Sequence, residues 1–167
     1  SLSTEDTFSY SGLSWQKDAS WGTYNITTLT AYNGAKNLKN ALIHSDNIYF
    51  AQAALKIGSK NMTSGLDKLK FNEDIDLNLA KSQYSNNGKI EKETLLADTG
   101  YGQGQILVNP VHIASIYSAF YNEGNMIKPY LEFKENASPT IWVENAFSKD
   151  AANEIKNDLI QVVENPE

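Results

Sequence analysis

The sequence contains no cysteine, which excludes both a disulfide framework and a zinc site built on thiolates. The absence of cysteine does not indicate whether the protein resides in an oxidising or a reducing compartment. The chain also lacks a basic stripe, because its lysines are scattered and its formal net charge is -6 at pH 7. Nucleic-acid binding requires clustered cations that displace counterions from the phosphates, so we expect no nucleic-acid partner.

Long apolar runs are absent as well. No stretch approaches the roughly 20 apolar residues that a membrane-spanning helix needs. The first ten residues, SLSTEDTFSY, do not place a basic segment before an apolar one, as a secretory signal would. We therefore expect either a soluble protein or a piece of a longer protein whose signal or anchor lies outside these residues.

The chain does contain enough apolar material for one domain. Apolar residues make up 41% of its 167 residues, and nine tyrosines and three tryptophans supply large side chains for burial. Residues 8–29 mix aromatic and β-branched residues with glycines, which predicts short strands and loops. We expect residues 1–33 to be extended or looping and residues 34–167 to be mainly helical, so that the fold is mainly α with short peripheral strands.

The spacing of apolar residues locates the helices. Intervals of three and four from residue 36 predict a helix to about residue 44, and a second apolar helix follows it and ends at Gly58. Asn109 followed by Pro110 predicts another helix start, with Gly124 as its stop. The remaining expected elements are a short helix over 64–71, a polar loop over 72–92, a strand over 140–143 and an amphipathic helix over 148–163.

A polar triplet, Ser45-Asp46-Asn47, separates the first two predicted helices. Ser45 and Asp46 are both typical helix N-caps, because their side chains accept hydrogen bonds from the free amides of a first turn. The triplet therefore has a purely structural interpretation. His44, Ser45 and Asp46 do not indicate a Ser-His-Asp triad, since neighbouring side chains on a helix or turn do not converge.

The stretch GYGQG, residues 100–104, brings three glycines together. It lacks the Lys-Ser/Thr ending of a phosphate-binding loop, so we expect no phosphate there. Glycine tolerates positive φ and lets the backbone approach another surface closely. The loop is therefore expected either to turn tightly or to lie against a cleft.

Neither a metal site nor a histidine base is indicated. Asp74 and Asp76 have the spacing that opens a calcium loop, but the glycine and the closing glutamate of such a loop are missing. His112 stands near a predicted helix start and is expected to be a surface or partly buried residue rather than a base. We therefore expect no metal and no cofactor.

Two longer stretches, LKNALIHSDNIYFAQAALKIG and LLADTGYGQGQILVNPVHIASIYSAFYNEGNMIKPYL, resemble the transpeptidase domain of class B penicillin-binding proteins. The resemblance is closest to the low-affinity type associated with methicillin resistance, and it extends from Trp15-Gln16-Lys17-Asp18 to the last helix. Ser-Asp-Asn is one of three signatures of the penicillin-recognising serine enzymes, beside Ser-x-x-Lys and Lys-Thr-Gly. The resemblance implies the helical lobe of the α/β, serine β-lactamase-like fold.

In this family a serine at a helix start attacks a D-Ala-D-Ala peptide or a β-lactam, and a lysine one turn later takes its proton. By position, the resemblance implies catalytic roles for Ser45, in the proton relay, and for Asn47, on the substrate amide. Asp46 is expected at the rim of the cleft, where it points away and holds the turn. The other residues expected to line the cleft are Tyr101, Gly102, Gln103 and Gly104.

The chain departs from the family pattern at the other two signatures. Ser14-Trp15-Gln16-Lys17 matches Ser-x-x-Lys, but it lies in predicted strand and loop, and closer to the triplet than the family's nucleophile does. No Lys-Thr-Gly or Lys-Ser-Gly occurs. We therefore expect one partial domain, residues 1–167, from a transpeptidase whose nucleophile and Lys-Thr/Ser-Gly strand lie outside this chain, and the fragment alone to be inactive.

The resemblance also implies ligands and a location. Peptidoglycan stem peptides and β-lactams are the expected ligands, at the extracytoplasmic face of the bacterial cell membrane, with membrane contact only through a segment absent here. Surfaces that would meet the missing sheet predict self-association or a weak fold. Two alternatives stay open: a non-catalytic module that binds cell-wall peptide or a partner on the same scaffold, and an unrelated helical domain with chance matches.

Overall fold

Helices dominate the fold. The computed structural model describes residues 2–75, 77–133 and 135–165, and it confirms the expected mainly α fold with short strands. Within these ranges, no helix combines the length and the apolar content needed to cross a membrane. The elements, beside a 3₁₀ turn at Ala19–Trp21, are β1 (Ser14–Trp15), β2 (Ile26–Thr27), α1 (Leu38–Ile43), α2 (Asn47–Ile57), α3 (Ser59–Lys68), α4 (Glu93–Gly100), α5 (Pro110–Tyr121), β3 (Met126–Ile127), β4 (Ile141–Val143) and α6 (Lys149–Glu164).

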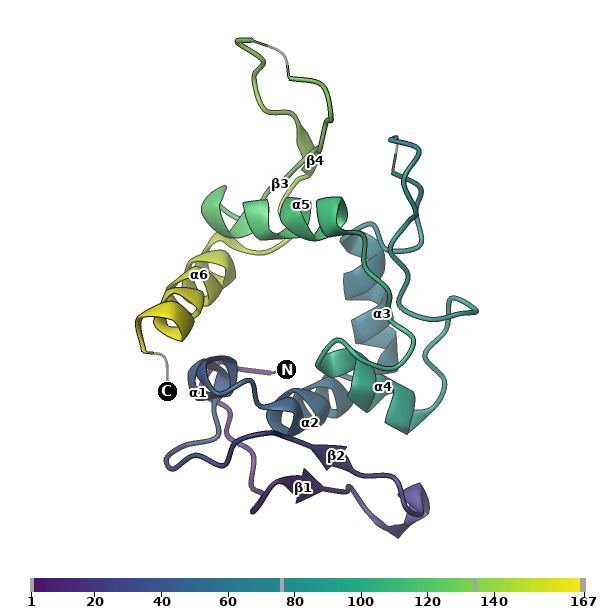
Figure 1. Cartoon of the computed structure of the whole chain (residues 1–167), viewed down its shortest axis with the longest axis vertical. Coiled ribbons are helices and arrows are strands. Elements are labelled where there is room, and N and C mark those ends of the chain that lie inside the picture. The colour runs from purple at the N-terminus through teal and green to yellow at the C-terminus, as the bar shows by residue number, and fades with distance from the viewer. Residues whose placement is uncertain (1, 76, 134, 166–167) are drawn as a thin grey trace.

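The helices follow one another around a closed arrangement (Figure 1). At one end, α1 and α2 lie beside the antiparallel pair β1–β2, and at the other end α5 lies beside the antiparallel pair β3–β4. Helix α3 extends from α2 toward α5 on one side, and α4 lies beside α2. Helix α6 packs against both α5 and α1, so that the last helix closes the fold onto the first.

Helix α2 contributes buried residues to all three core clusters and packs closely on α4. Its buried face includes Ala51, Ala53 and Ala54, which are small enough to let another helix approach. At the contact, a Cβ added to Gly100 of α4 would lie 2.5 Å from the carbonyl oxygen of Phe50 and 2.7 Å from the Cβ of Ala54. The first glycine of GYGQG is therefore required by helix packing.

Helix α5 begins as predicted but contains one correction. Asn109 caps it, and Pro110 is its first residue. The expectation that His112 lies at the surface or is only partly buried is wrong, because the ring is completely buried. Its Nδ1 lies 2.7 Å from Oγ of Ser82 and its Nε2 lies 2.7 Å from the carbonyl oxygen of Leu69. Burial lowers the pKa of His112, so the ring is a neutral core residue that ties α5 to the preceding segments.

Two helices differ from the prediction. Helix α3 begins at Ser59 rather than at residue 64 and ends at Lys68 rather than at residue 71. Gly58 takes a positive φ of 80° and turns the chain directly from α2 into α3, so the stop of one helix is the start of the next. Helix α4 is missing from the prediction. Its N-cap, Lys92, makes no capping hydrogen bond through its side chain, so the start of α4 lacks the signal of a capping residue.

Candidate active site

The polar triplet lies in the turn between α1 and α2, where hydrogen bonds fix the backbone. The amide of Ser45 donates to the carbonyl of Leu42 at 3.3 Å, and the amide of Asp46 donates to the carbonyl of Ala41 at 2.9 Å. This pair of hydrogen bonds closes many helices, and the residue at the position of Ser45 is then usually glycine. Ser45 adopts the left-handed conformation nonetheless, with φ of 50°, and it is exposed. The fold thus keeps an exposed serine where the backbone favours glycine.

Asp46 is completely buried and begins α2. Its Oδ1 accepts hydrogen bonds from the amides of Ile48, at 3.0 Å, and Tyr49, at 3.1 Å. These bonds satisfy two of the four free amides at the start of a helix. The capping interpretation of the triplet is confirmed, with Asp46 as the cap. Because the carboxylate of Asp46 has no exposed surface, it holds the turn and does not face solvent.

Two tyrosines complete the surroundings of Asp46. The hydroxyl of Tyr10 donates to Oδ2 of Asp46, and the hydroxyl of Tyr32 donates to the same oxygen at 2.8 Å. Burial of the hydroxyls, together with their bonds to Asp46, raises the pKa of both tyrosines, so both remain protonated donors at neutral pH. Sequence reasoning missed them, because they lie 36 and 14 residues before Asp46 and no local pattern connects them.

Asn47 is the first residue of α2 and faces β2. Its Nδ2 donates to the backbone carbonyl of Thr27 at 2.9 Å, and its side chain is half-buried. This contact uses one of the two amide hydrogens, and an asparagine side chain also has a second hydrogen and a carbonyl oxygen with which to meet a ligand. The orientation of Asn47 is therefore set by β2.

The glycine-rich loop leaves the end of α4 in a tight turn. Gly102 and Gly104 have φ of 78° and 75°, which glycine adopts without strain. Gly104 also has little room, since an added Cβ would lie 3.0 Å from the Cβ of Asp98. Gly102, Gln103 and Gly104 are exposed, whereas Tyr101 is half-buried. The loop therefore presents its backbone and Gln103 to solvent.

Asp98 supports this loop in the same way that Asp46 supports the turn. Its Oδ1 accepts the hydroxyls of Tyr101, at 2.7 Å, and of Tyr24. Its backbone carbonyl accepts the amide of Gln103 at 2.9 Å. Burial and the bond to Asp98 raise the pKa of Tyr24 to about 12. Each of the two predicted site loops is thus fixed by a carboxylate that receives two tyrosine hydroxyls.

The structure brings the triplet and the glycine-rich loop to the same end of the α2–α4 pair. Gly100, the last residue of α4, lies against the second turn of α2. Ile26 of β2, Ile48 of α2 and Ala97 of α4 form one buried cluster, and Tyr101 packs against it. Tyr101 of the glycine-rich loop therefore packs into the same buried cluster as Ile48, which follows the triplet.

The Ser-x-x-Lys match does not form a nucleophile and base. Ser14 lies in β1, which confirms the prediction of strand and loop for this segment. Lys17 forms an ion pair with Glu93, and its hydrogen bond to Glu93 raises the pKa of Lys17. A lysine that serves as a base at neutral pH needs a lowered pKa, so Lys17 is unsuited to that role.

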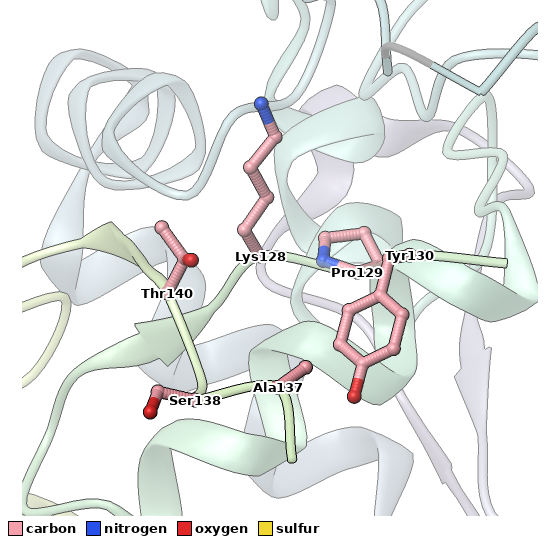
Figure 2. Close-up of a pocket in the computed structure, with 6 residues that line it drawn as sticks. All are labelled: Lys128, Pro129, Tyr130, Ala137, Ser138 and Thr140. Atoms are coloured by element: carbon pink, nitrogen blue, oxygen red, sulfur yellow. The ribbon is translucent and has the colours of Figure 1, made fainter. Parts of the chain in front are cut away.

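A pocket lies far from these loops, on the β3–β4 hairpin at the opposite end of the molecule (Figures 1 and 2). It has a volume of about 220 Å³. Figure 2 shows the ring of Tyr130 across from Ala137, with the amine of Lys128 extending away from both. Among the described residues, none of the triplet or the glycine-rich loop contributes to its lining, which is Lys128, Pro129, Tyr130, Ala137, Ser138 and Thr140.

Metal chemistry finds no support in the part of the chain that the structure describes. No group of three or more histidine, aspartate or glutamate side chains is placed there to hold an ion. Asp76, which belonged to the calcium-loop pattern, lies outside the described residues.

Comparison with known proteins identifies the family. The family model of the penicillin-binding protein transpeptidase domain matches residues 1–167. The chain belongs to this family. The sequence resemblance to penicillin-binding transpeptidases is thereby confirmed, whereas the low-affinity, methicillin-resistance type stays a prediction.

Curated relatives agree with this assignment. The chain is 40% identical over 165 residues to penicillin-binding protein 3 of Bacillus subtilis, and the match covers 98% of this chain and 25% of the relative. It is 29% identical over 130 residues to the probable peptidoglycan D,D-transpeptidase PbpC of Pseudomonas aeruginosa, covering 77% of this chain and 22% of that protein. The chain thus spans about a quarter of the length of these relatives.

Solved structures confirm the fold. The ceftriaxone acyl-enzyme complex of penicillin-binding protein A from M. tuberculosis matches with a TM-score of 0.73 and 18% identity, over 86% of this chain and 35% of that chain. A crystal structure of penicillin-binding protein A from the same organism matches with a TM-score of 0.70 and 20% identity, over 86% and 35% of the two chains. The expected helical lobe of the penicillin-binding transpeptidase fold is confirmed.

Proposed function

We propose that this chain is the helical lobe of a serine D,D-transpeptidase that cross-links peptidoglycan stem peptides through an acyl-enzyme. Membership of the transpeptidase family supports the reaction class. The D,D-transpeptidase named among its relatives supports the substrate class, and the acyl-enzyme complexes of the M. tuberculosis protein support β-lactams as inhibitors. The complete protein would act at the extracytoplasmic face of the bacterial cell membrane.

In this proposal residues 1–167 supply one wall of the cleft, and the nucleophilic serine, its lysine and the Lys-Thr/Ser-Gly strand lie elsewhere in the complete domain. The nucleophile attacks the carbonyl carbon between the two D-alanines, and the terminal D-alanine leaves with a proton on its amine. Ser45 relays that proton, and Asn47 hydrogen-bonds the substrate amide. The acyl group then passes to an amino group of a neighbouring stem peptide. Tyr101, Gly102, Gln103 and Gly104 line the cleft beside Ser45.

The observation that carries the proposal is the conformation of Ser45. A residue with a side chain loses roughly 1–2 kcal/mol in the left-handed region, and such strain persists only where the surroundings over-determine it, often at functional sites. Here two backbone hydrogen bonds and the buried cap Asp46 impose the turn. The strained turn presents an exposed hydroxyl at the start of α2, beside the orientated amide of Asn47.

The test compares this chain with a complete protein that contains it. Each is incubated with benzylpenicillin, and the intact mass is measured. We expect an adduct on the complete protein and an unchanged mass for residues 1–167, because Ser14 and Lys17 do not form a reactive pair. In the complete protein, Ser45→Ala should slow acylation by about 100-fold, within the range for losing a proton-transfer group.

The control and the contrary outcomes are distinct. Ser64→Ala removes an exposed serine hydroxyl on α3 and should acylate at the wild-type rate. An adduct on residues 1–167 would show that a nucleophile and its base are both present in this chain. A complete protein that binds stem peptide without forming an adduct would support the non-catalytic binding module instead.

A further inference from the structure

Asp46 is the residue through which the geometry of the proposed site is fixed. It stands between Ser45 and Asn47, and its carboxylate receives four hydrogen bonds. Two helix amides donate to Oδ1 and two tyrosine hydroxyls donate to Oδ2. Asp46 is completely buried, and a buried acceptor that loses a donor bears the cost of its desolvation. Removing a tyrosine hydroxyl therefore leaves part of a buried charge unsatisfied at the centre of the triplet.

The ring of Tyr32 contacts the residue that precedes the triplet. It stacks on the ring of His44, the residue before Ser45, with 4.0 Å between the ring centroids and an interplanar angle of 15°. The amine of Lys36 lies 3.2 Å from the centroid of the Tyr32 ring and donates to the backbone carbonyl of Tyr32 at 2.6 Å. Tyr32 is therefore held on its ring as well as at its hydroxyl, and it touches residues on both sides of Ser45.

Tyr10 reaches the same oxygen of Asp46 from another segment. The chain at Tyr10 precedes β1, whereas Tyr32 follows β2. Tyr10 also lies against the amine of Lys36, which is 5.4 Å from the centroid of its ring. Two segments that flank the β1–β2 pair thus converge on one carboxylate, each through a half-buried tyrosine.

We propose that Tyr10 and Tyr32 are positioning residues of the transpeptidase site, which hold Asp46 and through it set the placement of the Ser45 hydroxyl and the Asn47 amide. This inference rests on the proposed function. Neither tyrosine touches substrate in this scheme. Their removal should therefore slow the chemical step more than it weakens the binding of a β-lactam.

The experiment uses the complete protein with Tyr10→Phe, Tyr32→Phe and the double variant. Stopped-flow measurement with a fluorescent penicillin separates the acylation rate constant from the dissociation constant of the initial complex. The phenylalanine rings preserve stacking and remove only the hydroxyls. We expect the double variant to acylate about 10- to 100-fold more slowly, the size of effect that a misplacement of about 1 Å produces, while the dissociation constant changes by less than about threefold.

Two controls separate positioning from a general loss of stability. Tyr84→Phe removes another buried tyrosine hydroxyl, which donates to the carbonyl of Gly88 at 3.2 Å and belongs to a different core cluster. It should acylate at the wild-type rate. In the Ser45→Ala background, the double tyrosine change should cause less slowing than in the wild type, because only the placement of the Asn47 amide is then left to disturb.

The outcomes distinguish this inference from the proposed function. If the wild-type complete protein forms no acyl-enzyme, the proposed function fails and the inference fails with it. If the wild type acylates and the double variant acylates equally fast, the function stands and the positioning role is wrong. Equal slowing by the double change in the wild-type and Ser45→Ala backgrounds would also overturn the positioning role, because it would indicate a structural effect only.

Discussion

Replacing Ser45 by glycine is expected to stabilise the fold and to slow acylation at the same time. Ser45 takes the left-handed conformation at the end of α1, with φ of 50°. The amides of Ser45 and Asp46 close the helix through the hydrogen-bond pair that glycine usually accompanies. Glycine satisfies the backbone at this position, whereas the proposed chemistry requires the serine hydroxyl. The two demands can therefore be separated by one substitution.

The magnitude follows from two opposing effects. The Cβ of a residue in the left-handed region costs roughly 1–2 kcal/mol, which glycine avoids. Glycine also loses more backbone freedom on folding, which offsets about 0.5–1 kcal/mol of that gain. The expected net stabilisation is therefore about 0.5–1 kcal/mol, or a rise in Tm of about 1–4 °C for a chain of this size.

Denaturant unfolding followed by circular dichroism measures this difference. Ser45→Ala is the matched control, because alanine removes the same hydroxyl but keeps the Cβ and therefore the strain. We expect Ser45→Gly to be more stable than Ser45→Ala and than the wild type, and both variants to acylate slowly in the complete protein. Equal stability of the glycine and alanine variants would refute the argument from strain, and a fully active glycine variant would refute the role of the hydroxyl.

Two further predictions concern the core. Gly100→Ala should destabilise the fold by about 1–3 kcal/mol in denaturant unfolding, because the added Cβ would lie 2.5 Å from the carbonyl oxygen of Phe50. The control is Gly65→Ala on α3, which should not destabilise the fold in this way because its Cβ would meet nothing within 4 Å. Equal destabilisation by the two variants would disprove the packing argument. Burial lowers the pKa of His112 in the folded state below the ordinary value of 6.5. As pH falls, the unfolded state therefore binds the proton first. The contribution of His112 to stability is present above pH 6.5 and is lost as pH falls through the pKa of the folded state. His112→Gln should therefore flatten the pH dependence of the unfolding free energy as pH falls below 6.5, and an unchanged profile would count against a neutral buried ring.

Features with a local chemical signal were predictable from the sequence. Asn109 followed by Pro110 marks the start of α5, Gly58 marks the end of α2, and Ser148 caps α6 within one residue of the predicted start. In each case the side chain or the backbone freedom that defines the boundary belongs to the boundary residue itself. The capping role of Asp46 was predictable for the same reason, because its carboxylate bonds to amides two and three residues away.

Features that depend on distant partners were not predictable. The burial of His112 follows from Ser82 and Leu69, which lie 30 and 43 residues away. The roles of Tyr10 and Tyr32 follow in the same way from a carboxylate that is remote in sequence. A tyrosine in a polar segment is equally compatible with the surface, so only the folded arrangement distinguishes a structural tyrosine from an exposed one.

The α1–α2 turn and the glycine-rich loop are held by different interactions from those that hold helices α2 and α4 together. Helices α2 and α4 meet through Ala54 and Gly100, a contact too close to adjust without moving the backbone. The turn and the glycine-rich loop are instead held by tyrosine hydroxyls that donate to the carboxylates of Asp46 and Asp98. Three of these tyrosines belong to residues 10–32. A hydroxyl can be removed without disturbing the helix contact, so the geometry of the site and the stability of the core rest on separate groups of residues. The extended N-terminal region, which has almost no regular structure of its own, is therefore an integral part of the proposed site.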